Sequence, residues 1–368
     1  MKGGIESALR RLALAAVALA LAACAIVRDS SQSALDAFPP VASGAPPGAS
    51  PKAMSAARAL RRGVNFGNML EAPAEGAWGV RLDDSFFDLV AEAGFTSVRL
   101  PVRWSNHASS DAAATIDEAF ARRVDHVIDA LLGRGLTVVV NMHHYRQLDG
   151  DTLDRGERRV PDEVKQLRFL NMWRQIAQRY RDKPDALLFE LYNEPHGDQQ
   201  SSWNELAARA LGVVRARNPG RTVVIGPVSW NSARALKDLQ LPNDPHLIVT
   251  FYLYDPVEFT HQGAPWMSPP PRTGVDCCSA AQRQQIVEML DIAAQWGRSA
   301  GYPMWLGEFG AYGQAAMDAR ERYTRFMRDE AERRRISWAY WEFAAGFGVY
   351  DPTARQWREP LKQALLGK

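Results

Sequence analysis

The sequence is poor in cysteine and has no excess of charge of one sign. Three cysteines in 368 residues are too few, and odd in number, for a disulfide framework. Lysine and arginine total 44 and aspartate and glutamate 42, so the chain lacks the basic surface of a nucleic-acid-binding protein, and we expect no nucleic-acid partner. It also lacks a Gly-x-Gly-x-x-Gly motif and the His-x-x-x-His and Cys-x-x-Cys spacings of zinc sites, so we expect neither a cofactor nor a metal ion.

Apolar and aromatic residues, by contrast, are abundant. Hydrophobic residues make up 46% and charged residues 23%, which is typical of a globular protein and excludes wholesale disorder. The 11 tryptophans, 10 tyrosines and 14 phenylalanines indicate a large core or a surface that stacks flat ligands.

The N-terminal region has the pattern of an export signal. Residues 1–23 begin with basic side chains and end in an apolar run of 12 residues, too short to span a bilayer as a helix. The run closes with Leu-Ala-Ala-Cys24, which resembles the bacterial lipobox, where the cysteine becomes the lipidated first residue. We therefore expect an exported protein anchored through Cys24 in the bacterial envelope, in the outer membrane. Ordinary cleavage near Ala23, giving a secreted or periplasmic protein, is the alternative.

Residues 24–60 connect this signal to the rest of the chain. They are rich in alanine, proline and serine and lack the apolar periodicity of a core element, which predicts a flexible tether. With no internal repeat evident, we expect one folded catalytic domain over residues 61–368.

Eight short apolar runs alternate with helical patterns from residue 61 onward. Helical periodicity follows Asp84, Asp162 and Ser279, each of which can begin a helix. Continuous apolar strands alternating with helices predict an α/β fold with a buried parallel sheet, and eight such units predict a single (β/α)8 TIM barrel. An open doubly wound sheet is the alternative, weakened by the missing glycine motif. The predicted strands are 63–66, 96–100, 136–143, 186–192, 222–226, 247–254, 304–308 and 336–343.

Polar and ionisable side chains stand at the ends of these otherwise apolar runs. In a barrel of this kind the chemistry lies at the C-terminal ends of the strands. Because a buried carboxylate without a partner is costly, we infer that these side chains form a site and do not fill the core. They are Asn65, Arg99, His143, His144, Asn193, Glu194, Tyr252, Tyr254, Glu308 and Trp341.

Two carboxylates in this set, Glu194 and Glu308, end the fourth and seventh strands and can converge across the barrel. Paired carboxylates are the machinery of glycoside hydrolysis, in which one group must be protonated and the other ionised. Proximity of like charges separates their pKa values and allows both states near neutral pH. Arg99, expected near Glu308, would favour the ionised form of that residue.

Sequence motifs surround most of these strand ends. They are Gly63-Val-Asn-Phe-Gly-Asn68, Val98-Arg-Leu-Pro101, Asn141-Met-His-His144, Leu191-Tyr-Asn-Glu-Pro195, Phe259-Thr-His-Gln-Gly-Ala264, Leu306-Gly-Glu-Phe-Gly310 and Trp338-Ala-Tyr-Trp-Glu-Phe343. Together they resemble glycoside hydrolase family 5 in its cellulase type, over the whole predicted barrel, and the Asn-Glu-Pro and Gly-Glu-Phe-Gly pair is the most specific match.

The resemblance implies a reaction and a role for each residue. The chain would be a retaining, endo-acting hydrolase of β-1,4-glucan, with Glu308 as nucleophile and Glu194 as acid/base, their carboxyl groups about 5–5.5 Å apart. The supporting set would be Arg99 and Tyr254 on Glu308, Asn193 at the sugar 2-hydroxyl, His143 lining the same subsite and Trp341 beneath the sugar ring, with Asn65 and His144 nearby.

One position departs from the family pattern. The family's sixth strand normally carries His-x-Tyr, whereas this sequence reads Tyr252-Leu-Tyr254. A tyrosine hydroxyl can donate a hydrogen bond but does not titrate near pH 7. We expect retained activity, and a weakly active or inactive glycan-binding relative is the alternative.

The sequence motifs do not determine which β-glycan is the substrate. Trp78, Trp230 and Trp266 on predicted loops are candidate platforms for sugar rings, whereas Trp104 and Trp203 fit packing positions. We expect a monomer acting on a polysaccharide or oligosaccharide. Mannan, xyloglucan, mixed-linkage glucan and β-1,3-glucan are alternatives to β-1,4-glucan, because loops decide between them.

One pair of adjacent histidines and one pair of adjacent cysteines could each form a further site or bond. His143 and His144 could bind zinc, but adjacent strand residues point to opposite faces, which disfavours that reading. The α-carbons of Cys277 and Cys278 are closer than a disulfide usually allows, so a strained bridge and two free thiols are both open.

Overall fold

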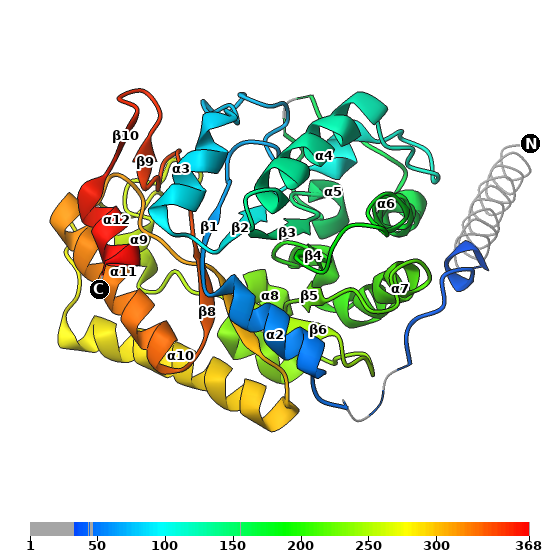
Figure 1. Cartoon of the computed structure of the whole chain (residues 1–368). Helices are drawn as coiled ribbons and strands as arrows, with labels where there is room; N and C mark the ends of the chain where they lie inside the picture. Colours follow the sequence, from blue (N-terminus) through cyan, green and yellow to red (C-terminus); the bar gives the residue numbers. More distant parts are fainter. Residues whose placement is uncertain (1–32, 43, 45–46, 155, 368) are drawn as a thin grey trace, which may run out of the picture.

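The computed structural model describes residues 33–42, 44, 47–154 and 156–367, and within them eight parallel strands close into a barrel (Figure 1). Hydrogen-bonded neighbours follow chain order, and β8 pairs with β1 to complete the ring. The predicted (β/α)8 barrel is confirmed, and the open doubly wound alternative is wrong. The strands are β1 (Arg62–Asn65), β2 (Ser97–Leu100), β3 (Thr137–Asn141), β4 (Leu187–Glu190), β5 (Val223–Ile225), β6 (Leu247–Tyr252), β7 (Met304–Glu308) and β8 (Ser337–Tyr340).

All eight strands fall on the eight predicted apolar runs. Their residues are almost entirely buried, because one face of each strand fills the barrel and the other packs against helices. This burial on both faces explains why the strands read as continuous apolar runs without alternation.

Helices surround the barrel on all sides (Figure 1). The α-helices are α2 (Pro51–Leu60), α3 (Ser85–Ala93), α4 (Glu118–Leu132), α5 (Arg146–Asp149), α6 (Lys165–Arg179), α7 (Trp203–Arg215), α8 (Val228–Asn231), α9 (Val257–Thr260), α10 (Ala280–Ala300), α11 (Met317–Arg333) and α12 (Glu359–Leu366). The 3-10 turns are η1 (Trp104–His107), η2 (Asp162–Val164), η3 (Gly197–Gln200) and η4 (Ala233–Asp238). A hairpin of β9 (Tyr350–Asp351) and β10 (Gln356–Trp357) precedes α12.

The predicted helix starts are realised in different ways. Ser279 caps α10 with a reciprocal pair of bonds to Gln282. Asp84 precedes α3 but makes no side-chain cap, and Asp162 begins the short turn η2, after which α6 follows. In the loop before α10 a disulfide bond joins Cys277 and Cys278.

Residues 51–60 are helical, so the prediction of a flexible tether over residues 24–60 is wrong for this part. They form α2, which begins at the N-cap Ser50 and directs three apolar side chains to the barrel, Ala53, Ala57 and Leu60. Their spacing of four and three residues is that of one helix face, a signal hidden by the small size of alanine. The preceding segment is also attached, since the Val41 N–H donates to the Ala208 carbonyl.

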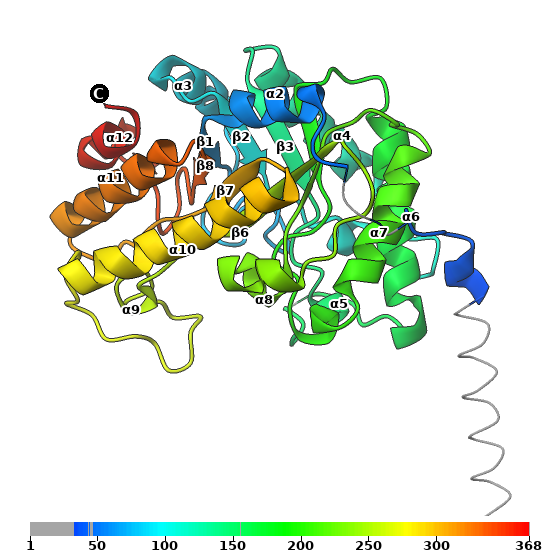
Figure 2. The same cartoon turned by 90° about the horizontal axis from the view of Figure 1, so that it is seen from below.

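Helix α2 covers the N-terminal end of the barrel. The carbonyls of Ala57 and Leu60 accept hydrogen bonds from Ser337 and Ser97, the first residues of β8 and β2. Figure 2 shows α2 at one end of the barrel, while α5, α8 and α9, which follow β3, β5 and β6, lie at the other. The strand ends that carry the predicted site therefore face away from α2. No helix in the described part of the chain is long and apolar enough to cross a membrane.

Candidate active site

Arg99, near the end of β2, joins side chains from four strands. The side chain is fully buried. Its Nη1 donates to Glu308 Oε1 at 2.7 Å and to Asn65 Oδ1 at 3.0 Å. Its Nε and Nη2 donate to Glu190 at 2.6 and 3.0 Å, and Nη2 also reaches Asn193 Oδ1 at 2.8 Å. With Nη2 also donating to the hydroxyl of Tyr252, one guanidinium connects its own strand β2 to the C-terminal ends of β1, β4, β6 and β7.

Glu308, the last residue of β7, is 4% exposed and is held at both carboxyl oxygens. Oε1 accepts from Arg99, and Oε2 accepts from the hydroxyl of Tyr254 at 2.8 Å. Burial raises the pKa of Glu308, and these two donors oppose that rise. The pKa of Glu308 is raised to about 7, and the two donors stabilise the ionised form that a nucleophile requires.

Glu194 follows β4 and is set up differently. Its φ of +50° lies in the left-handed region that residues other than glycine rarely adopt. Burial raises the pKa of Glu194 well above its ordinary value, and the nearby charge of Glu308 adds to the rise. Its one side-chain donor is weak, since Asn193 Nδ2 lies 3.4 Å from Oε2. This environment keeps Glu194 protonated where Glu308 is ionised.

Tyr252 occupies the position where the family carries histidine. Tyr252 is the last residue of β6, and Tyr254 follows two residues later in the loop after that strand. The Tyr252 hydroxyl accepts from Arg99 Nη2 and lies 2.9 Å from Glu190 Oε1 and 3.0 Å from Asn193 Oδ1. The hydroxyl is thereby part of the hydrogen-bond network around Arg99.

His143 is buried and neutral. Burial lowers its pKa well below the ordinary value, and His144 and Arg99 lower it further. Asn141 Oδ1 accepts from the Val102 N–H, so the Asn141 amide nitrogen is turned to His143 Nδ1, 3.1 Å away. Nδ1 is then the acceptor and Nε2 carries the proton, which leaves an N–H donor for a ligand.

Trp341 lies beside His143, with the two rings nearly parallel at 15° and 6.0 Å between centroids. The indole needs the glycine at position 67, because a Cβ there would lie 2.8 Å from an indole carbon. His144 packs edge-on against His143 at 4.3 Å and against Trp78 at 5.5 Å. These rings form an aromatic cluster from the ends of β3 and β8 and the loop after β1.

Three tryptophans expected as sugar platforms are exposed. Trp78 is 37% exposed, and Trp230 and Trp266 are each 57% exposed. Trp230 stacks on His196 at 4.9 Å and Trp266 packs on Tyr312, so each indole is held with part of its surface open. The packing role expected for Trp104 and Trp203 is confirmed, since each is 1% exposed.

Glu190 belongs to the site but was not among the predicted residues. It is completely buried at the end of β4, with both oxygens on Arg99. The signal for it was a carboxylate closing the apolar run Leu187–Phe189, where a charge requires a partner. The partner lies on another strand, which the sequence does not reveal.

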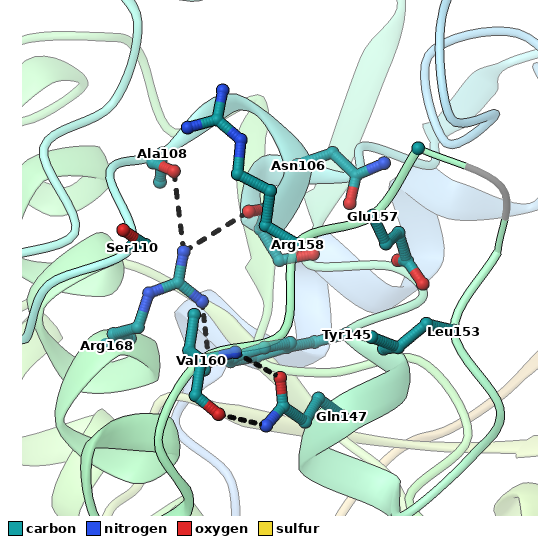
Figure 3. A pocket seen from close by; sticks show the side chains of 12 residues that line it. Asn106, Ala108, Ser110, Tyr145, Gln147, Leu153, Glu157, Arg158, Val160 and Arg168 are labelled. Atoms are coloured by element: carbon teal, nitrogen blue, oxygen red, sulfur yellow. Dashed lines mark hydrogen bonds between the residues drawn. The ribbon is translucent and has the colours of Figure 1, made fainter.

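A separate hollow of about 90 Å³ lies between η1, α5 and α6 (Figure 3). Arg168 spans it, donating to the Tyr145 hydroxyl and to the Ala108 carbonyl, while Gln147 pairs with the backbone of Val160. None of the 12 lining residues is a predicted site residue. The bonds between Gln147 and Val160 hold the loop after α5 in place, and the hollow is not the catalytic centre.

Two further predictions concern the N-terminal segment and metal binding. The signal over residues 1–23 and the lipidation site Cys24 lie outside the described residues. Within the described ranges, no group of three or more histidine, cysteine, aspartate or glutamate side chains is arranged to hold a metal ion.

A closed (β/α)8 barrel with two carboxylates in opposed environments at its C-terminal face is the architecture of a glycoside hydrolase. Residues 61–346 match the family model described as Cellulase (glycosyl hydrolase family 5). The chain belongs to glycosyl hydrolase family 5.

Known relatives agree with this assignment. The chain is 35% identical over 310 residues to Endoglucanase H of Acetivibrio thermocellus, covering 83% of this chain and 32% of that protein. It is 28% identical to Cellulase/esterase CelE of the same organism, covering 82% of this chain and 37% of that protein. The chain thus spans about a third of the length of these curated relatives.

Solved structures are similar over most of the barrel. A structure described as an endoglucanase has 41% identity and a TM-score of 0.81, covering 86% of this chain and all of that one. Cel5A of Thermotoga maritima, in a complex with mannotriose, has 42% identity and a TM-score of 0.80, covering 84% of this chain and 99% of that one.

Proposed function

We propose that this chain is a retaining glycoside hydrolase that cleaves β-1,4-glucan internally by double displacement. The observation that carries the proposal is the contrast between two neighbouring carboxyl groups. Glu308 has a guanidinium and a phenol as donors, whereas Glu194 has one long amide contact. That contrast supplies an anion and an acid at one site.

The reaction follows from these two states. Glu308 attacks the anomeric carbon while Glu194 transfers its proton to the departing glycosidic oxygen, giving a glycosyl ester on Glu308. Glu194, now ionised, takes a proton from water, and the water oxygen displaces Glu308 from the anomeric carbon. Both groups return to their starting protonation states, and the product keeps its anomeric configuration.

The substrate is proposed from the relatives and the exposed aromatic rings. A similar structure with 39% identity is described as an endo-β-1,4-glucanase in complex with substrate. Trp78, Trp230 and Trp266 offer flat apolar faces suited to the C–H surfaces of β-linked sugars. Mannan is the second candidate, because Cel5A of Thermotoga maritima binds mannotriose.

The decisive experiment compares Glu308→Gln and Glu194→Gln on carboxymethyl cellulose and on an aryl cellobioside with a good leaving group. Glu308→Gln should lose at least about 10³-fold on both substrates, because the covalent step is gone. Glu194→Gln should lose about 10²–10⁴-fold on the polymer but far less in the first step on the aryl substrate, whose leaving group needs no proton.

Glu330→Gln is a matched control for Glu308→Gln, since Glu330 is as buried as Glu308. It lies on α11 and forms ion pairs with Arg333 and Arg334. Wild-type rates in Glu308→Gln would refute the assignment. Binding of the polymer by wild-type protein without release of reducing sugar would select the glycan-binding alternative. Tyr252 argues against that alternative, because its hydroxyl lies within the network of Arg99.

We also propose export and lipid anchoring through Cys24, on the sequence pattern alone. Mass spectrometry of the mature N-terminus from a bacterial host should find a diacylated or triacylated cysteine at position 24. An unmodified N-terminus near Ala25 would show ordinary cleavage and a secreted or periplasmic protein instead.

A further inference from the structure

Glu190 carries a buried charge to which the two-carboxylate reaction gives no role. Its side chain has no exposed surface. A buried carboxylate is tolerated only with strong partners, and Glu190 has them in a bidentate pair with Arg99, at 2.6 and 3.0 Å. Arg99 is also the residue that binds Glu308 Oε1. Glu190 therefore contacts the same guanidinium as the nucleophile.

A second connection runs through Tyr252. Its hydroxyl accepts from Arg99 and lies within hydrogen-bond distance of Glu190 Oε1 and Asn193 Oδ1. Arg99 Nη2 also donates to Asn193 Oδ1 at 2.8 Å. With donors on that oxygen, the Asn193 amide is oriented so that Nδ2 faces Glu194 Oε2. Glu308 is thus connected to Glu190 through Arg99 alone, and Glu194 is connected to Glu190 through Asn193 and then Arg99 or Tyr252.

We propose that Glu190 is a positioning residue for the hydrolysis: it fixes the guanidinium of Arg99 and, through Arg99 and Tyr252, orients the nucleophile and the Asn193 amide. The inference rests on the proposed function. Glu190 acts through its neighbours, and the tyrosine at position 252 lets this network form without a side chain that titrates near neutral pH.

The charge of Glu190 gives the proposal a distinctive signature. The ionisable groups facing Glu308 are Arg99 from β2, Glu190 and Glu194 from β4 and the loop after it, and Tyr252 and Tyr254 from the end of β6 and the loop after it. The negative charge of Glu190 raises the pKa of Glu308. Removal of that charge alone would lower the pKa of Glu308, whereas displacement of Arg99, which the positioning role predicts, would raise it, and Arg99 has the larger effect of the two.

The test measures kcat, KM and the pH profile of kcat/KM for Glu190→Gln on the aryl cellobioside. We expect kcat to fall about 10²-fold, because small displacements of reacting groups are expensive. KM should stay within about twofold, since substrate contacts are retained. The acidic limb of the profile should move to higher pH, because a displaced Arg99 no longer lowers the pKa of Glu308.

The matched control is Asp244→Asn, which breaks another buried bidentate pair. Asp244 binds Arg215 at 2.5 and 2.9 Å, just before β6 at the opposite end of the barrel. This variant should keep the wild-type kcat and the wild-type acidic limb, even where its thermal stability falls.

Each result supports or overturns the proposal. A folded Glu190→Gln with wild-type kcat, or with its acidic limb at the wild-type position or at lower pH, overturns it. If Glu190→Gln does not fold, Tyr252→Phe decides, because it keeps the Arg99–Glu190 pair. That variant should lose about tenfold in kcat with little change in KM, and a wild-type kcat overturns the proposal. An inactive wild type would refute the proposed function itself.

Discussion

At Glu308, burial and hydrogen bonding act on the same carboxyl group in opposite directions. Burial disfavours the anion, while Arg99 and Tyr254 each donate to one of its oxygens. Glu194, which lacks comparable donors, has its pKa raised further by burial and by Glu308. The different roles of two chemically identical side chains thus come from their immediate neighbours.

Tyr254→Phe tests this balance. The hydrogen bond from Tyr254 lowers the pKa of Glu308, so its loss should raise that pKa. The acidic limb of kcat/KM should move to higher pH by about one to two units, because a hydrogen bond to a charged group contributes about 1.5–3 kcal/mol. A profile recorded from pH 3 to pH 9 checks it. Tyr302→Phe, which loses a buried hydrogen bond to the Asp244 carbonyl, should leave the limb in place.

Among the elements, α2 shows how a segment of unremarkable composition becomes part of the fold. Alone it is a ten-residue helix whose apolar side chains are mostly small, too short to be stable in water without packing. Against the barrel it buries Ala53, Ala57 and Leu60 and satisfies hydroxyl donors of β2 and β8. It closes the end of the barrel opposite the site, so it should affect stability and not catalysis.

Leu60→Ala should lower the free energy of unfolding by about 2–5 kcal/mol, the usual effect of removing a fully buried leucine. The kcat/KM measured well below the melting temperature should not change. Met54→Ala, at a 40% exposed position of the same helix, should change stability by less than about 0.5 kcal/mol. Equal effects of the two substitutions in denaturant titrations would contradict the packing role of α2.

Across the whole molecule, buried acids link stability to pH. Glu342 accepts backbone hydrogen bonds from Ala344, Ala345 and Phe347 in the loop after β8, and burial raises its pKa to about 7. Glu71, in the loop after β1, has its pKa raised by burial to about 7 as well, and Glu342 adds to that rise. An acid with a raised pKa binds its proton more tightly when folded. The stabilising effect of this proton is complete at a pH below the pKa of the group in the unfolded chain. It is lost as the pH rises through the pKa of the group in the folded protein.

Glu342→Gln should therefore flatten the dependence of stability on pH. Between pH 4.5, the ordinary value for this carboxyl group, and about pH 7, the wild-type free energy of unfolding should fall more steeply than that of the variant. The difference in slope should approach about 1.4 kcal/mol per pH unit, the value for one proton. Denaturant titrations at several pH values measure it, and identical slopes would contradict the raised pKa.

Much of the site was predictable because its members close strands that local patterns identify. Asn193, Glu194 and Glu308 could be placed at the barrel's C-terminal face before any contact was known. The partner of Glu190 could not be predicted, since it is Arg99, 91 residues away in sequence. The partners of Tyr252 were equally hidden, because hydrogen bonds across a barrel depend on which strands lie opposite.

The sequence by itself determined the number and order of the barrel strands, since apolar periodicity is a property of neighbouring residues. It also determined which side chains end the strands, and hence the family. Only the tertiary structure decided that residues 51–60 close the barrel and that Glu190, Arg99 and Tyr252 form one network. The physical reason is that a charge or a small apolar face acquires its role from the surface it meets, and that surface comes from distant parts of the chain.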